Sequence, residues 1–155
     1  MFIVFLSVAV PLGLFVVAPS LAGWLAGKTV RRDAVFFAAL GIYFISWYIP
    51  SPLIDGMDTS FSTHFIGGGI FSGLMWLWAK RQLGWKPAWM LEVLGIYAFV
   101  STLGVANELF ELAVAQFGIL RITSVDTWWD LLANTLGASV FWVGYRIARK
   151  FRKTA

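Results

Sequence analysis

Five long apolar segments, joined by short polar connections, make up most of this chain. They run from Phe2 to Gly27, Ala34 to Pro50, Thr63 to Ala79, Trp89 to Ala115 and Trp128 to Ala148. A helix needs about 20 apolar residues to cross a hydrocarbon core of roughly 30 Å. Only 13% of the residues are charged, about half the share found in soluble domains. We therefore expect an all-α membrane protein, with five transmembrane helices bundled into a single integral membrane domain over residues 1–155.

Eleven of the twelve basic residues follow the first, third and fifth of these segments. They are Lys28, Arg31, Arg32, Lys80, Arg81, Lys86, Arg146, Arg149, Lys150, Arg152 and Lys153. With five crossings they all fall on one side of the membrane, which the positive-inside rule identifies as the cytoplasm. The other side holds Arg121 and most of the acidic residues: Asp55, Asp58, Glu108, Glu111, Asp126 and Asp130. We expect a multi-pass protein of the inner (plasma) membrane, with its N-terminus outside and its C-terminus in the cytoplasm.

Composition excludes several other classes of protein. The chain has no cysteine, so disulfides and thiolate metal ligands are excluded. The net charge of +4 does not indicate a nucleic-acid partner, because the basic residues gather at segment ends instead of covering one face. Membrane lipids are the expected partners. Small residues in the third and fifth segments, such as Gly69 and Gly137, predict close helix packing, and a membrane-protein partner or a homo-oligomer remains open.

The candidate site consists of polar residues at the outer ends of the last three segments. They are His64, Asn107, Glu108, Glu111, Asp126, Asp130 and Asn134. With the expected topology all of them lie at one depth. Residues three or four apart share a helix face, so Glu111 lies beside Asn107 and Glu108, and the three residues on the fifth segment form one stripe. Charged groups are costly in hydrocarbon, so this stripe should face the bundle interior.

Each of these residues also has a purely structural interpretation. Asp126, ahead of Thr127, is a typical N-cap, and Asn134 suits an interhelical hydrogen bond. A single histidine such as His64 is more often hydrogen-bonded at the interface than bound to a metal. Glu108 and Glu111 repel each other unless they bind a cation, share a proton or pair with a base such as Arg121. Asp55 and Asp58 are expected to be solvated or to cap the loop between Ser51 and Ser62.

The residues of the candidate site could also act as metal ligands. Imidazole and carboxylate groups suit Mg²⁺, Mn²⁺ or Zn²⁺, and the candidate ligands are His64, Glu108, Glu111 and Asp130. Their spacing matches no named zinc motif, and the sequence shows no nucleophilic triad and no nucleotide-binding motif. A divalent metal ion, carboxylate chemistry without metal, and a structural or ligand-binding polar network all remain open.

Three short stretches also carry a family likeness. The sequence DTWWDLLANTLGA from Asp126 to Ala138 follows NELFE at Asn107 and HFIGG at His64. Over roughly residues 63–140 this resembles the VanZ-like and YjdF-like families of small bacterial membrane proteins, with the paired glutamates closer to YjdF. These families have no settled biochemical activity. The association of VanZ with low-level teicoplanin resistance implies work at the cell envelope.

Together these features predict an outer-facing site that binds an envelope lipid head group or amphiphile. The alternatives are a metal-dependent membrane hydrolase or transferase acting on a phosphate-bearing lipid, and a structural subunit of a membrane complex. A proton-coupled transporter is disfavoured, because no ionisable residue falls at the expected midplane. Whether the protein is an enzyme is left open.

Overall fold

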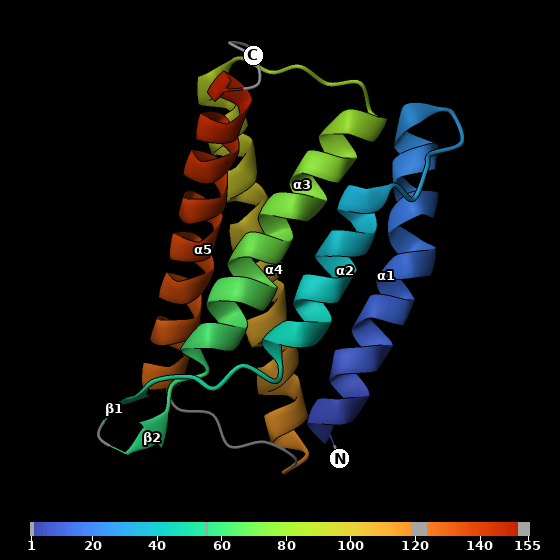
Figure 1. Ribbon diagram of the computed structural model, residues 1–155. Coiled ribbons are helices and arrows are strands. Elements are labelled where there is room, and N and C mark those ends of the chain that lie inside the picture. Colours follow the sequence, from blue (N-terminus) through green and yellow to red (C-terminus); the bar gives the residue numbers. More distant parts are fainter. Residues whose placement is uncertain (1, 55, 119–123, 152–155) are drawn as a thin grey trace.

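The computed structural model describes residues 2–54, 56–118 and 124–151, and the side chains of residues 2, 3, 54, 57 and 124–126 lie outside this description. In these ranges the chain forms five long helices that run alongside one another (Figure 1). The elements in chain order are α1 (Phe2–Ala26), α2 (Ala34–Ser46), β1 (Leu53–Ile54), β2 (Met57–Asp58), η1 (Thr63–Ile70), α3 (Phe71–Gln82), α4 (Trp89–Gln116) and α5 (Ser124–Phe151). The prediction of a bundle of five helices is confirmed, with η1 and α3 forming one continuous helix. The loop between α2 and η1 adds a small antiparallel hairpin that the sequence did not indicate.

The helix ends follow local capping chemistry. Asp33 caps α2, where its Oδ1 accepts hydrogen bonds from the backbone N–H groups of Val35 and Phe36 at 3.0 and 3.2 Å. Gly27 and Gly84, just beyond the ends of α1 and α3, have φ values of 61° and 67°. This left-handed conformation costs glycine little, so glycine is the usual residue that closes a helix.

Two helix boundaries differ from those expected. α2 ends at Ser46 and not near Pro50: the N–H groups of Tyr48 and Ile49 bond to carbonyls three residues back, and Pro50 has no N–H with which to continue the helix. α5 already includes Ser124, so Asp126 lies inside its first turn. The prediction that Asp126 is the N-cap is therefore wrong, although its position still suits the positive end of the helix dipole.

The third helix begins with eight residues of π-helix, η1, before continuing as α3. π-Helix is wider than α-helix and uncommon in proteins as a whole. Where it does occur, it is often at a functional site. The predicted close packing is confirmed here. A Cβ atom on Gly69 would lie 2.6 Å from the Cα of Gly137, and one on Gly137 would lie 2.0 Å from the carbonyl oxygen of Phe65. Only glycine at both positions allows η1 and α5 to approach this closely.

Apolar side chains lie both between the helices and on their outer surface. A core cluster joins α1, α2 and α3 around Phe36 and Trp78, whose rings are 4.8 Å apart. Two segments, Val4–Ala26 and Trp89–Gln116, are long and apolar enough to cross a membrane, and only 11% and 22% of their apolar windows are buried. The core helix of a soluble protein would be mostly buried. These exposed apolar surfaces fit a membrane protein.

Candidate functional site

Three helices bring His64, Glu108 and Asp130 together at one end of the bundle. His64 comes from η1, Glu108 from α4 and Asp130 from α5. Each offers one potential metal-ligand atom, and the three atoms lie within 4.8 Å of one another. We call these residues the acidic triad. The triad is largely shielded, since 13% of the His64 side chain and 2% of the Asp130 side chain are exposed.

The closest contact of the triad joins His64 to Asp130. Their Nε2 and Oδ1 atoms are 3.3 Å apart. The pair forms at the close packing of η1 on α5, so the glycines there set the distance between its two backbones. A carboxylate beside an imidazole can hold the ring in one orientation, whether the ring binds a proton or a metal.

Asn134 lies one turn along α5 from Asp130 and is also buried. Its amide fills the space left by two glycines. A Cβ atom on Gly68 would lie 1.6 Å from the Asn134 Oδ1, and one on Gly104 would lie 3.1 Å from its Nδ2. The glycines of η1 and α4 therefore make room for a polar side chain at the centre of this three-helix contact.

Glu111 and Asn107 form a separate pair on α4. The Asn107 Nδ2 donates a hydrogen bond of 2.6 Å to the Glu111 Oε1, across one helical turn. The sequence predicted both Glu108 and Glu111 as metal ligands. Among the described residues, the Glu108 carboxylate is the one that lies with His64 and Asp130. Glu111 is held by its neighbour on the same helix.

The remaining predicted residues are peripheral or undescribed. Asp58 accepts a hydrogen bond of 2.9 Å from the backbone N–H of Ser60, which confirms its loop-capping role. The side chain of Asp126, and the residues Asp55 and Arg121, lie outside the described residues.

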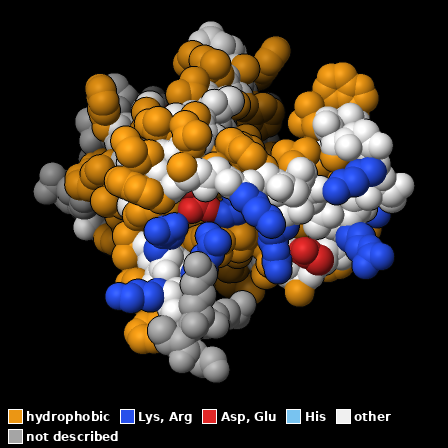
Figure 2. All heavy atoms as spheres, turned by 90° about the horizontal axis from the view of Figure 1, so that it is seen from above, with side chains coloured by type: hydrophobic (Ala, Val, Ile, Leu, Met, Phe, Trp, Pro, Cys, Tyr) orange, Lys and Arg blue, Asp and Glu red, His pale blue; other side chains and the backbone are white. Residues whose placement is uncertain are grey.

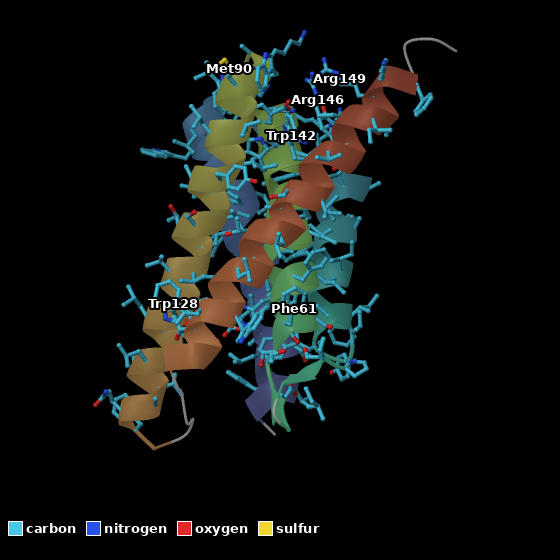
Figure 3. The ribbon with its side chains drawn as sticks, turned by 90° about the vertical axis from the view of Figure 1, so that its left-hand side faces the viewer. Phe61, Met90, Trp128, Trp142, Arg146 and Arg149 are labelled. Carbon is cyan, nitrogen blue, oxygen red and sulfur yellow. The ribbon has the colours of Figure 1, made fainter. Side chains whose placement is uncertain are left out.

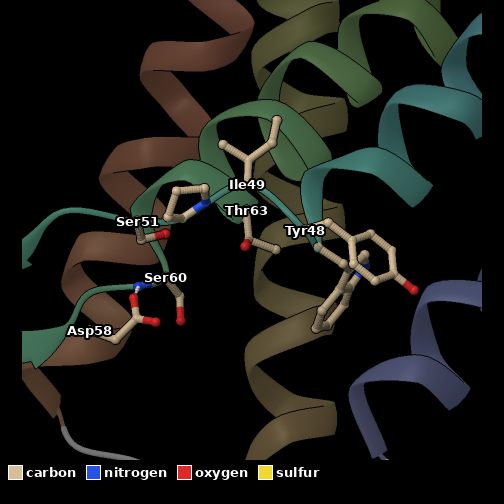
Figure 4. A pocket seen from close by; sticks show the side chains of 8 residues that line it. Tyr48, Ile49, Ser51, Asp58, Ser60 and Thr63 are labelled. Carbon is tan, nitrogen blue, oxygen red and sulfur yellow. Dashed lines mark hydrogen bonds between the residues drawn. The ribbon is translucent and has the colours of Figure 1, made fainter.

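A pocket of about 270 Å³ opens at the same end of the bundle (Figure 4). Its lining includes the carboxylate-bearing Asp58 and four residues with hydroxyl groups: Tyr48, Ser51, Ser60 and Thr63. Thr63 directly precedes His64 in the chain. The pocket is therefore close in sequence to the acidic triad.

The opposite end holds a second, partly buried polar cluster, whose basic residues the sequence indicated only as markers of topology. We call it the basic-end cluster: Lys80, Glu92, Tyr145 and Arg146. The Lys80 ammonium contacts the Glu92 carboxylate and lies 3.4 Å from the Tyr145 hydroxyl. Arg146 approaches the second oxygen of Glu92 at 3.8 Å. One feature of the sequence could have indicated this cluster: Glu92 is an acidic residue at the end of the chain segments where most of the basic residues lie.

Both clusters use the same three helices with the same spacing. Sixteen residues separate His64 from Lys80, Glu92 from Glu108, and Asp130 from Arg146. This spacing corresponds to about 24 Å along an α-helix. Figure 3 shows the two levels, with Trp128 and Phe61 towards one end and Arg146 and Arg149 at the other. The helices thus carry charged or ionisable groups near both ends, and no charged residue lies between the two levels on any of the three helices.

Comparison with known proteins identifies a family match. A family model described as "Predicted membrane protein (DUF2238)" matches residues 34–150, which include every residue of the acidic triad and of the basic-end cluster. No curated protein and no solved structure matches the chain. The description names neither the VanZ-like nor the YjdF-like family, so the resemblance to those families stays a prediction.

Proposed function

The chain belongs to the DUF2238 family of predicted membrane proteins, and we propose that it binds a divalent cation at the acidic triad and through that ion holds a phosphate-bearing lipid head group. One observation carries this proposal: three different helices place an imidazole and two carboxylates with ligand atoms within 4.8 Å. A hydrolase or transferase acting on the same lipid is a second candidate.

The proposed topology has five crossings, with the acidic triad at the outer face. α1 and α4 meet the length and apolarity of a membrane span. The continuous helix formed by η1 and α3 carries residues of both clusters, and so does α5. The separation of about 24 Å between the two levels approaches the thickness of the hydrocarbon core. When η1 and α3 are counted as one helix, α2 is the shortest of the five, with 13 residues. Residues 47–50 extend it towards the outer face.

Surface residues support this placement. Exposed tryptophans lie near both ends, with Trp128 near the acidic triad and Trp24, Trp85 and Trp89 near the basic end. Indole rings prefer the level of the lipid head groups. Figure 2 shows Lys and Arg side chains gathered at the end where α5 finishes. The positive-inside rule makes that end cytoplasmic in an inner membrane.

The chemistry of the triad favours a cation. Two shielded carboxylates beside a histidine repel one another unless a proton or a positive ion lies between them. Zinc binds imidazole nitrogen and carboxylate oxygen at about 2.1 Å in tetrahedral sites, which places two ligand atoms on one ion about 3.4 Å apart. The triad would therefore have to contract by about 1 Å at its widest to hold a zinc ion. Three protein ligands leave at least one coordination position open for a phosphate oxygen or a water molecule.

The open position connects metal binding to the two candidate functions. Envelope phospholipids carry phosphate oxygens, which are hard ligands for Zn²⁺, Mn²⁺ or Mg²⁺. A head group held there would remain bound in the first candidate function. In the second, an ion held by His64, Glu108 and Asp130 would supply Lewis acidity for hydrolysis of the phosphate ester, in which water adds to phosphorus and the lipid alcohol leaves with its oxygen. The hydroxyl-lined pocket beside Thr63 would accommodate the polar part of the lipid (Figure 4).

The test is metal analysis of the full chain, purified in mild detergent without chelator and measured by plasma mass spectrometry. We expect about one divalent ion per chain in the wild type. Glu108→Gln and Asp130→Asn should lose it. Glu111→Gln is the matched control, because Glu111 lies three residues away on the same helix and is hydrogen-bonded to Asn107. Wild-type protein without metal, or equal loss in the control, would overturn the proposal.

Native mass spectrometry then separates the lipid part of the proposal. Phospholipid that co-purifies with the wild type should be released by EDTA and should be reduced in Asp130→Asn. Release of a shortened lipid or of free phosphate during incubation would favour the hydrolase. If EDTA does not change the amount of phospholipid bound, the metal ion does not hold the lipid, and the lipid part of the proposal is wrong.

A further inference from the structure

The basic end of the bundle contains a cavity that the acidic triad does not explain. It has a volume of about 550 Å³, within the usual range for ligand sites of roughly 300–1,000 Å³. It lies where the end of α3, the start of α4 and the end of α5 meet. Its charged lining residues are Lys80, Arg81, Lys86, Glu92 and Arg149.

The charge of this cavity is strongly positive. Four of these side chains are cationic, and Glu92 supplies the one carboxylate among the described lining residues. Glu92 is already engaged by Lys80 and approached by Arg146. Arg81 is partly balanced by Asp33 at 3.8 Å, in an exposed pair that contributes little. Lys86 and Arg149 therefore supply positive charge at the rim that no described carboxylate of the lining neutralises.

The floor of the cavity consists of buried side chains that contact one another. Lys80 is 8% exposed and Glu92 3% exposed, so their contact is shielded from water. The Lys80 ammonium also lies 4.8 Å from the centre of the Tyr145 ring. Burying a charged pair costs free energy unless the geometry and neighbouring hydrogen bonds compensate it. These contacts hold one ammonium group and one phenol hydroxyl in fixed positions at the cavity floor.

The walls resemble a site at the membrane surface. Trp85 and Pro87 line the cavity beside the basic groups. The Trp85 ring packs edge-on against Trp76 with 5.3 Å between the ring centres. Tryptophan prefers the level of the head groups, and basic pockets between transmembrane helices suit anionic lipid head groups. A phosphate group would meet two exposed cations at the rim and the buried Lys80 ammonium with the Tyr145 hydroxyl at the floor.

We propose that this cavity between α3, α4 and α5 binds a phosphate-bearing anion, either a lipid head group or free phosphate. The proposal is independent of the acidic triad, because it rests on different residues and on the other end of the bundle. It would give the protein an anionic-ligand site on its basic face, which the family match does not assign.

The test is native mass spectrometry of the full chain in mild detergent with three separate probes: inorganic phosphate, phosphatidylglycerol and phosphatidylcholine. Lys86→Gln and Arg149→Gln remove charge from the rim. Lys28→Gln is the matched control, because Lys28 is an exposed lysine at the same end that does not line the cavity. Each rim charge is expected to contribute about a fivefold change in affinity, and the double variant more.

The outcomes separate the ligand sources. Phosphatidylglycerol binding that weakens in the rim variants but not in Lys28→Gln, with little phosphate or phosphatidylcholine binding, identifies an anionic lipid head group. Phosphate binding with the same dependence identifies a free phosphate. Absence of both ligands from the wild type, or equal weakening by Lys28→Gln, would overturn the proposal. All three substitutions are at exposed side chains, so loss of folding is not expected to confuse the result.

Discussion

The His64 Nε2 lies 3.3 Å from the Asp130 Oδ1, although the two residues belong to η1 and α5 and are far apart in the chain. Their contact coincides with the place where Gly69 and Gly137 bring the two backbones together. The geometry of the acidic triad is therefore tied to helix packing, and changes in that packing should be visible in both stability and metal content.

The first prediction concerns the glycine contact. In Gly137→Ala the new Cβ would lie 2.0 Å from the carbonyl oxygen of Phe65, so η1 or α5 must shift. We expect destabilisation of about 1–3 kcal/mol, typical of overpacking, measured by thermal unfolding in detergent. Gly144→Ala, on the same helix with nothing within 4 Å of the added atom, should be neutral or slightly stabilising. Equal melting temperatures for the two variants would contradict the close packing of η1 on α5.

The second prediction concerns the buried charges of the basic-end cluster. Glu92→Gln leaves the buried Lys80 ammonium without its carboxylate, which should cost about 3–5 kcal/mol of stability. Asp33→Asn, which weakens an exposed pair with Arg81 but keeps an amide able to cap α2, should cost no more than about 1 kcal/mol.

A double variant tests the cause of that loss. Lys80→Met with Glu92→Gln removes both charges, so much of the stability lost in Glu92→Gln should return. Denaturation in mild detergent would show this as a recovered transition midpoint. If the double variant is as unstable as Glu92→Gln alone, the loss does not arise from an unpaired ammonium group.

The third prediction concerns metal removal. A ligand that binds only the folded state stabilises it, by about 2.7 kcal/mol when its concentration is 100 times Kd. EDTA should therefore lower the melting temperature of the wild type and of Glu111→Gln. It should leave Asp130→Asn unchanged, because that variant has lost a ligand of the triad. A uniform EDTA effect on all three proteins would point to metal bound elsewhere.

The fourth prediction concerns orientation in the membrane. The chain has no cysteine, so single cysteines can be introduced into an unlabelled background. Leu53→Cys, in the exposed β1 strand, should react with a membrane-impermeant maleimide in intact spheroplasts. Lys86→Cys should react only after lysis. The reverse pattern would invert the proposed topology, and equal labelling of both in intact spheroplasts would rule out a membrane between the two ends.

Local sequence determined much of the fold. Apolar length predicted the five helices, and Gly27 and Gly84 close two of them because glycine readily adopts positive φ. The four-residue repeat in α5 predicted that Asp130 and Asn134 share a face, and both are buried. The helical segments and the shared face of Asp130 and Asn134 depend on residues close together in the chain, so spacing was enough to predict them.

Tertiary packing decided the rest. Spacing placed Glu108 and Glu111 on one side of α4, but the rotation of α4 against η1 and α5 selects Glu108 for the acidic triad. The π-helical form of η1 and the burial of Glu92 against Lys80 also went unpredicted. Each depends on contacts between distant segments. Helical periodicity fixes which residues share a face, whereas only the packed bundle determines what that face meets.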